Sequence, residues 1–318
     1  MKPIKVSAAE KKLRIGIYYD HRFGRNDGPP LYYKHAMERM GLNINHTIPR
    51  GNTLADVGAY DLHFWVDWGE DALGYPRFDI PKDGGKTVYV SSDTHLGRKH
   101  RFDMASRYQF VFFNQKRAVE EYTKLYQVNL PKANKYVGWL PHAFEPEAYP
   151  NITTLKKYDV GFIGHVQDPT RKNFNGFSRT DALDRLFKEF PNFYYGSRHP
   201  AYPEKNMFED AAHHFSESKI VFNVSIVDDI NMRTFEALGT GSFLLTNWLP
   251  TLGELFEDGK DLVTYKTLDE MVEKAKYYLA HDKEREKIAA AGYAKAIKLH
   301  TYQHRIRTIL DVIKQTKV

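Results

Sequence analysis

The sequence has no cysteine, only 15 prolines in 318 residues, and no long apolar run. The lack of cysteine excludes disulfides, thiolate nucleophiles and zinc–thiolate sites. No stretch approaches the roughly 18 apolar residues that cross a bilayer, and the charged beginning of the chain lacks the apolar core of a signal peptide. With 42% hydrophobic and 27% charged residues, the composition is globular. We therefore expect a cytoplasmic protein without a transmembrane segment.

Three motifs are also missing. No Asp-x-Asp motif suggests a chelated metal, no glycine cluster has the spacing of a dinucleotide-binding loop, and no Lys/Arg-rich tract resembles a nucleic-acid-binding arm. The net charge is +6, and residues 1–150 hold 22 Lys/Arg against 17 Asp/Glu, whereas residues 151–318 hold 24 against 23. This bias could steer an acidic partner towards the first half, although a solvated basic surface is the more frequent cause. We expect no metal, and nucleic acid is not the favoured partner.

Apolar strand-like runs alternate with helical patterns along the whole chain. The strand-like runs are residues 13–19, 62–66, 87–90, 110–113, 136–140, 160–163, 193–195, 220–224, 243–245 and 262–265. The helical patterns are residues 31–40, 116–125, 179–189, 232–238, 268–281, 284–299 and 302–314. Near-continuous apolar strands separated by helices are typical of parallel sheets that are covered on both faces. The sequence therefore predicts an α/β protein.

The length and a proline-rich segment indicate two domains. A single hydrophobic core seldom serves more than about 250–300 residues, and residues 141–157 hold three prolines and show no periodicity. We predict Rossmann-like domains over residues 1–141 and 158–301, facing a cleft. The last helix carries Ile306, Ile309, Leu310 and Ile313 at helical spacing. This stripe needs a groove, so we expect residues 302–318 to cross back to the first domain.

In the first domain, the candidate residues follow two strands, because open parallel sheets bind ligands at the carboxyl ends of their strands. Gly24, Arg25 and Gly28 follow the first strand and could admit an acceptor and meet an anion, although an exposed polar turn explains them equally well. Asp93 and His95 follow the strand at 87–90 and could act as a base and its orienting partner, or could contact an acceptor hydroxyl. A histidine in such a place is more often structural.

In the second domain, the strand at 160–163 ends at Gly164, and His165, Arg171 and Lys172 follow it. A glycine at the tip of a strand lets a diphosphate approach the backbone, and a nearby cation can neutralise it. Tight packing at the glycine, with a solvated Arg-Lys pair, is a comparably good explanation. These residues are a candidate phosphate site.

Residues 223–241 contain more candidate site residues than any other segment of similar length. A buried strand leads to Asp228 and Asp229, and then to a short helix that begins near Asn231 and ends at Gly239. The unpaired N–H groups at the start of such a helix favour an anion, and Arg233 adds a full charge beside them. Glu236 is placed to accept hydrogen bonds from nucleotide hydroxyls. Alternatively, Arg233 and Glu236 form an i,i+3 surface pair. We assign donor binding to residues Asn231, Met232, Arg233, Thr234 and Glu236.

The run from Asn231 to Thr246 resembles the CgeB-like (spore-maturation) group of GT-B glycosyltransferases. The segments 254–256, 259–265 and 300–305 have the family's order and spacing, and the resemblance covers about residues 158–310. It implies a first domain that binds an acceptor and a second that binds a nucleotide sugar. In related retaining transferases, a Glu-x7-Glu pair contacts the sugar and the ribose. Glu236 matches the second position, and Asp228 stands at the first, where a shorter carboxylate reaches less far.

The resemblance implies an enzyme that transfers a hexose-type unit from a UDP- or TDP-type sugar to an unknown glycan, protein or small molecule. The reaction would retain configuration and need no cofactor or metal, with Asp228, Asp93 and His95 as catalytic candidates and Arg171 or Lys172, together with Arg233, on the phosphates. Two alternatives stay open. One is a non-catalytic binding or coat-assembly protein on the same fold, and the other is a glycosyltransferase that modifies nucleic acid.

Overall fold

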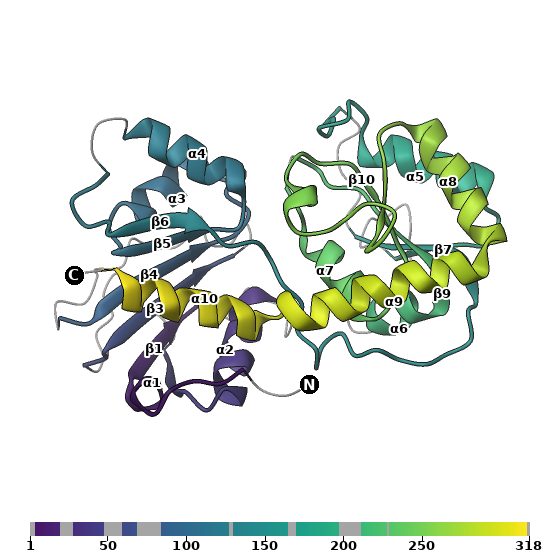
Figure 1. Cartoon of the computed structure of the whole chain (residues 1–318). Coiled ribbons are helices and arrows are strands. Elements are labelled where there is room, and N and C mark those ends of the chain that lie inside the picture. Colours follow the sequence, from purple (N-terminus) through teal and green to yellow (C-terminus); the bar gives the residue numbers. More distant parts are fainter. Residues whose placement is uncertain are drawn as a thin grey trace. The chain divides into compact units, whose positions relative to one another are not determined.

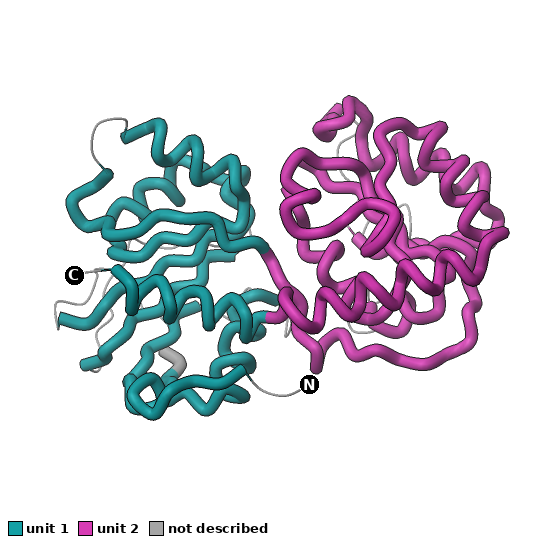
Figure 2. Tube along the Cα trace, viewed as in Figure 1, with its two compact units in different colours: residues 1–141, 302–318 teal, residues 142–301 magenta. Residues whose placement is uncertain are grey.

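The chain divides into two compact units, residues 1–141 with 302–318, and residues 142–301 (Figure 2). The structure is a computed structural model, and it describes residues 4–19, 28–47, 59–68, 84–126, 130–164, 170–196, 211–227 and 229–316. Each unit is built on a parallel sheet with helices on its faces (Figure 1). The predicted α/β fold with two Rossmann-like domains is confirmed.

Unit 1 has a six-stranded parallel sheet in the order β2-β1-β3-β4-β5-β6. Its elements are α1 (Ala8–Lys12), β1 (Arg14–Tyr18), α2 (Pro29–Arg39), β2 (Asn43–Thr47), β3 (Leu62–Asp67), β4 (Lys86–Ser91), α3 (Arg98–Ala105), β5 (Phe110–Phe113), α4 (Lys116–Leu125), β6 (Tyr136–Trp139) and α10 (Tyr302–Gln315). Every residue of β3 and of β5 is buried, as expected for central strands covered on both faces. The aromatic rings of Phe102, Phe113 and Tyr122 join α3, β5 and α4, with centroids 5.2–5.6 Å apart.

The last helix, α10, belongs to unit 1, as its apolar stripe predicted. The ring of Tyr302 packs edge-on against Tyr33 of α2 at 4.9 Å, and Ile306 is buried. Arg305 donates from Nε to the carbonyl of Pro141 at 2.7 Å. Burial in this contact lowers the pKa of Arg305 to about 10. The apolar stripe of α10 therefore packs against α2 and holds the end of the chain on unit 1.

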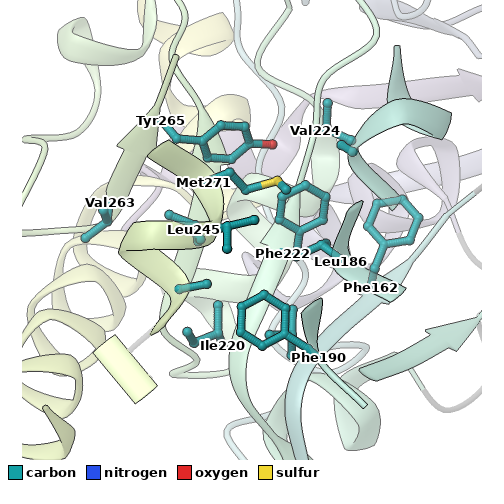
Figure 3. Close-up of a cluster of buried hydrophobic side chains, with 14 of the residues drawn as sticks. Phe162, Leu186, Phe190, Ile220, Phe222, Val224, Leu245, Val263, Tyr265 and Met271 are labelled. Carbon is teal, nitrogen blue, oxygen red and sulfur yellow. The ribbon is translucent and has the colours of Figure 1, made fainter. Parts of the chain in front are cut away.

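Unit 2 has a five-stranded parallel sheet in the order β11-β10-β9-β7-β8. Its elements are β7 (Tyr158–Ile163), α5 (Arg179–Glu189), β8 (Phe193–Gly196), α6 (Ala211–Glu217), β9 (Ser218–Asn223), α7 (Met232–Gly239), β10 (Leu244–Asn247), the 3₁₀ helix η2 (Leu252–Glu254), β11 (Val263–Tyr265), α8 (Leu268–Ala280) and α9 (Asp282–Leu299). Figure 3 shows the core on this sheet, where Phe222 lies 6.0 Å from Phe162 and 5.7 Å from Tyr265 between ring centroids.

The segment expected to link the domains contains part of unit 2. Phe144 is buried, its N–H donates to the carbonyl of His300, and its ring lies against Gly239. A Cβ on Gly239 would come within 2.3 Å of that ring, so α7 needs glycine there for close packing. None of the described helices is long and apolar enough to span a membrane.

Candidate functional site

Gly164 and Arg233 meet at the carboxyl end of β7. The guanidinium of Arg233, in the first turn of α7, donates from Nε to the carbonyl of Ile163 at 2.5 Å and from Nη1 to Oδ1 of Asn223 at 2.7 Å. Its third nitrogen, Nη2, has no acceptor among the described residues. A Cβ on Gly164 would lie only 2.1 Å from Nη2. The missing side chain at Gly164 therefore makes room for a guanidinium that is fixed at two nitrogens and has one left for a ligand.

A second arginine shares the same aromatic ring. The guanidinium carbon of Arg233 lies 4.5 Å from the centroid of Phe162, and that of Arg179 lies 5.5 Å from it. Arg179 is buried, and its Nη2 donates to the carbonyl of Val224 at 2.9 Å. Burial lowers the pKa of Arg233 to about 10, and burial together with the charge of Arg233 lowers the pKa of Arg179 to about 9. Both stay cationic at neutral pH, so their combined field favours an anion at this edge.

Arg179 was missed by sequence reasoning. Ser178 and Asp181 form a capping box that starts α5 at Arg179, with Ser178 Oγ accepting from the Asp181 N–H at 3.0 Å. The Ser-x-x-Asp spacing could have identified this helix start. It could not have shown that the first residue of the helix points inward, onto Phe162.

Asn223, at the end of β9, organises the start of α7. Its buried side chain accepts from Arg233 and from Nδ2 of Asn231 at 3.0 Å, and it donates to the hydroxyl of Thr246 at 3.0 Å. Asn231 is the N-cap of α7, and its Oδ1 accepts from the N–H of Thr234 at 3.3 Å. One amide thus aligns the cap and the arginine. Sequence reasoning did not single out Asn223 as a site residue.

Glu236 lies one turn further along α7 and is only 8% exposed. Its charge raises the pKa of Arg233, opposing the larger effect of burial, so the two charges are close. The hydrogen bonds of Arg233 go to Ile163 and Asn223. An exposed i,i+3 surface pair therefore does not describe these residues. A mostly buried carboxylate beside a guanidinium is suited to accept hydrogen bonds from a ligand's hydroxyls.

The remaining donor candidates differ in their surroundings. Thr234 is buried and Met232 partly buried, both on α7. Arg171 is exposed, and its charge contributes to lowering the pKa of Arg179, so it adds to the same positive edge. Lys172 donates to Oδ2 of Asp181 at 2.7 Å and so already has an ion-pair partner. Asp228 and His165 lie outside the described residues, as do Gly24 and Arg25 of the first unit.

In unit 1, Asp93 and His95 lie in the loop between β4 and α3. Asp93 has φ +50°, which is uncommon for a residue with a side chain. Arg101 is completely buried and donates to the carbonyls of Asp93 and Leu96, while its Nε donates to Asp67 at 3.1 Å. The buried ion pair therefore sets the shape of the loop.

Two further contacts bear on the candidates of unit 1. The Nδ1 of His95 lies 3.0 Å from Nε2 of Gln115, a hydrogen bond that orients the ring. Gly28 is the N-cap of α2, and a Cβ on it would come within 3.0 Å of the Trp68 ring. Gly28, Asp93 and His95 all follow carboxyl ends of strands in one parallel sheet. The structure thus places them on the edge where the sequence predicted an acceptor. In the described part of the chain, no group of three or more His, Asp or Glu side chains is placed to hold a metal ion.

Residues 179–311 match the sequence profile of the family described as glycosyl transferase-like. The match begins at the first residue of α5, ends within α10, and includes Arg179, Arg233 and Glu236. This stretch is therefore similar to glycosyltransferases. No curated protein matches the chain as a whole or in part.

Comparison with solved structures shows that the chain has the GT-B fold along almost its whole length. HepE from Anabaena, in complex with UDP and glucose, has a TM-score of 0.60 at 12% identity, over 95% of this chain and 100% of that one. T4 phage BGT, in complex with UDP and Mn²⁺, has a TM-score of 0.59 at 14% identity, over 96% and 99%. An α-glucosyltransferase in complex with UDP-glucose and DNA containing an abasic site has a TM-score of 0.65 at 10% identity, over 95% and 100%.

Proposed function

We propose that unit 2 binds the diphosphate of a UDP-type sugar at Gly164 and Arg233, and that the enzyme transfers the sugar to an acceptor bound by unit 1. The observation that carries this proposal is the geometry of Arg233, whose Nη2 is left for a ligand while its other nitrogens are held by Ile163 and Asn223. The Arg179 guanidinium on the same phenyl ring adds a second positive charge. UDP in the complexes of HepE and T4 phage BGT supports uracil as the base.

The chemical task of this site is to stabilise the departing diphosphate. As the bond between the sugar and the phosphate breaks, negative charge grows on the leaving oxygen and the anomeric carbon gains oxocarbenium character. Fixed donors aimed at that oxygen need no reorganisation during the reaction, and Arg233 is fixed in this way before any ligand arrives. The N–H groups at the start of α7 add positive partial charge. Glu236 would accept hydrogen bonds from the ribose, and Asp228 would face the transferred sugar.

Glu236→Gln is expected to weaken UDP binding by about 10- to 150-fold, because hydrogen bonds from hydroxyls to a charged carboxylate are worth roughly 1.5–3 kcal/mol. The substitution keeps the size of the side chain, so the fold is retained. Titration calorimetry with UDP and with uridine is the measurement. Both ligands carry the ribose, so both should lose affinity; unchanged affinity for uridine would remove Glu236 from the ribose site.

Gly164→Ala is expected to weaken UDP binding at least tenfold, because the new methyl group would displace Nη2 of Arg233, which lies 2.1 Å from its position. Gly196→Ala is the matched control. Gly196 ends the neighbouring strand β8, and a Cβ there would meet its nearest atoms at an ordinary 3.4 Å. Calorimetry should show that Gly196→Ala binds UDP like the wild type. If Gly164→Ala and Gly196→Ala both bind UDP like the wild type, UDP binding does not require the observed position of the Arg233 guanidinium.

We infer a CgeB-like transferase that retains configuration and needs no metal, with Asp93 and His95 contacting the acceptor from the loop that Arg101 shapes. T4 phage BGT was solved with Mn²⁺, so the metal requirement is tested directly. Product formation should continue unchanged in excess EDTA. A rate that falls in EDTA and returns with Mn²⁺ would show that a metal takes part.

The second candidate is a transferase that acts on nucleic acid, and the α-glucosyltransferase solved with DNA favours it. Release of UDP from UDP-glucose, measured with and without duplex DNA, separates the candidates. We expect slow release of UDP without DNA, no stimulation by DNA, and loss of release in Arg233→Gln. Stimulation by DNA would support the second candidate. UDP binding without release from any of a panel of UDP-sugars would instead indicate the non-catalytic alternative.

A further inference from the structure

A cavity of about 610 Å³ lies in unit 1 at the edge where the strands of the sheet begin. Arg14, Leu62 and Lys86 are the first residues of β1, β3 and β4, and all three line this cavity. The opposite wall comes from the end of α10, including Ile313 and Lys314, and Figure 1 shows this end of α10 beside β4. Asp93 and His95 follow the carboxyl end of β4. The cavity is therefore separate from the edge assigned to the acceptor.

The lining is largely apolar, and the size suits a small molecule. Leu13, Leu62, Leu310 and Ile313 contribute aliphatic side chains, and Leu62 and Leu310 are buried. Sites for drug-sized ligands have volumes of about 300–1,000 Å³ and combine apolar walls with a few polar groups. The walls are firmly joined, because Glu10 of α1 forms an ion pair with Arg307 of α10 at 2.6 Å. The cavity can thus take the apolar body of a ligand without opening the unit.

The charges around the cavity do not cancel. Both carboxylates of the lining are already paired, Glu10 with Arg307 at 2.6 Å and Asp61 with Arg14 at 3.0 Å. The hydrogen bonds from Arg307 lower the pKa of Glu10 to about 2, so this carboxylate is ionised and satisfied at neutral pH. Lys86 and Lys314 also line the cavity, and neither ammonium group has a hydrogen bond or ion pair with a described residue. Lys86 is half-buried and Lys314 is exposed, so two positive charges border the cavity without an ion-pair partner among the described residues.

We propose that this cavity binds an amphipathic anion, a molecule with one carboxylate or phosphate group on an alkyl chain or apolar ring system. The apolar part packs on the leucine side chains and Ile313, and the anionic group binds Lys86 and Lys314. A wholly apolar ligand would leave both ammonium groups unpaired beside it, and a free inorganic anion would leave the apolar walls uncovered. The inference does not depend on the proposed donor site, since the cavity and that site lie in different units.

Calorimetry on the full chain tests this with four probes: dodecanoate and dodecyl phosphate below their critical micelle concentrations, dodecanol below its solubility limit, and acetate. At least one of the two long-chain anions is expected to bind with a stoichiometry of one, at least tenfold more tightly than dodecanol, and acetate is expected not to bind. The anion that binds more tightly shows whether the cavity prefers a carboxylate or a phosphate. Dodecanol that binds as tightly as both anions, or the absence of binding by either anion, would overturn the proposal.

Variants place the binding in this cavity. The double variant Lys86→Gln, Lys314→Gln is expected to lose the preference for the anion over dodecanol, and Ile313→Glu to weaken the anion at least tenfold by introducing a like charge. Lys124→Gln is the matched control, because Lys124 is likewise a lysine in the last turn of a helix, α4, and does not line the cavity. UDP affinity should be the same in all variants, which shows that unit 2 is intact. Anion binding that persists in the double variant would contradict the assignment.

Discussion

Arg101→Met is expected to lower the free energy of unfolding by about 3–5 kcal/mol, because it leaves the charge of Asp67 buried without its partner. Arg101 is fully buried and Asp67 is 4% exposed, with 3.1 Å between Nε and Oδ2. The hydroxyl of Tyr89 also donates to Asp67, and burial raises the pKa of that tyrosine well above its usual value. The hydrogen bond from Tyr89 alone cannot offset the cost of burying the charged carboxylate of Asp67.

Urea denaturation measures this effect, and Arg117→Met is its control. Arg117 forms an ion pair with Glu121 at 2.9 Å, but its side chain is 59% exposed, so its loss should cost less than about 1 kcal/mol. The double variant Asp67→Asn, Arg101→Met should recover part of the stability, because the uncompensated charge is gone. A loss below 1 kcal/mol for Arg101→Met alone would show that water reaches Asp67.

Arg233→Gln is expected to weaken UDP binding by about 10- to 150-fold and uridine binding by much less, because the guanidinium is placed for the diphosphate and not for the nucleoside. Arg233→Lys should recover only part of the affinity, since an ammonium cannot hold Ile163 and Asn223 and bind a phosphate in the same geometry. Calorimetry with both ligands is the measurement.

Arg185→Gln is the matched control for this experiment. Arg185 lies on α5 of the same unit, with a side chain that is 38% exposed and paired with Asp269 at 3.0 Å. Its replacement should leave the affinities for UDP and uridine unchanged. If Arg233→Gln loses equal affinity for both ligands, Arg233 supports the start of α7 structurally, and Arg179 and Arg171 become the phosphate candidates.

Most of the fold could be predicted because its central strands are almost wholly apolar, as in Phe110–Phe113 of β5. The missed elements lack such a pattern. The edge strand β2 has the sequence Asn-Ile-Asn-His-Thr, with only one apolar residue. Helix α3 begins Arg-Lys-His-Arg, and it buries Arg101 completely, a residue that a pattern based on apolar residues counts as surface.

The candidate site could be predicted where its residues are close in the sequence. Asn231, Arg233 and Glu236 lie within one helix and its cap, so helical geometry brings them together. The approach of Arg233 to Gly164 depends on the pairing of β7 with β9 and on the direction of one side chain. Neither the strand pairing nor the direction of the side chain can be recognised from the neighbouring residues in the sequence. For the same reason the sequence did not predict Arg179 as a site residue, because it reaches Phe162 from a different element.

The most direct test is a crystal structure of the protein with UDP. We predict a diphosphate oxygen within about 3.2 Å of Nη2 of Arg233, beside Gly164, and a ribose hydroxyl in hydrogen-bonding contact with Glu236. The guanidinium should keep its bonds to Ile163 and Asn223. A diphosphate bound elsewhere, with Nη2 of Arg233 facing only solvent, would contradict the proposed donor site.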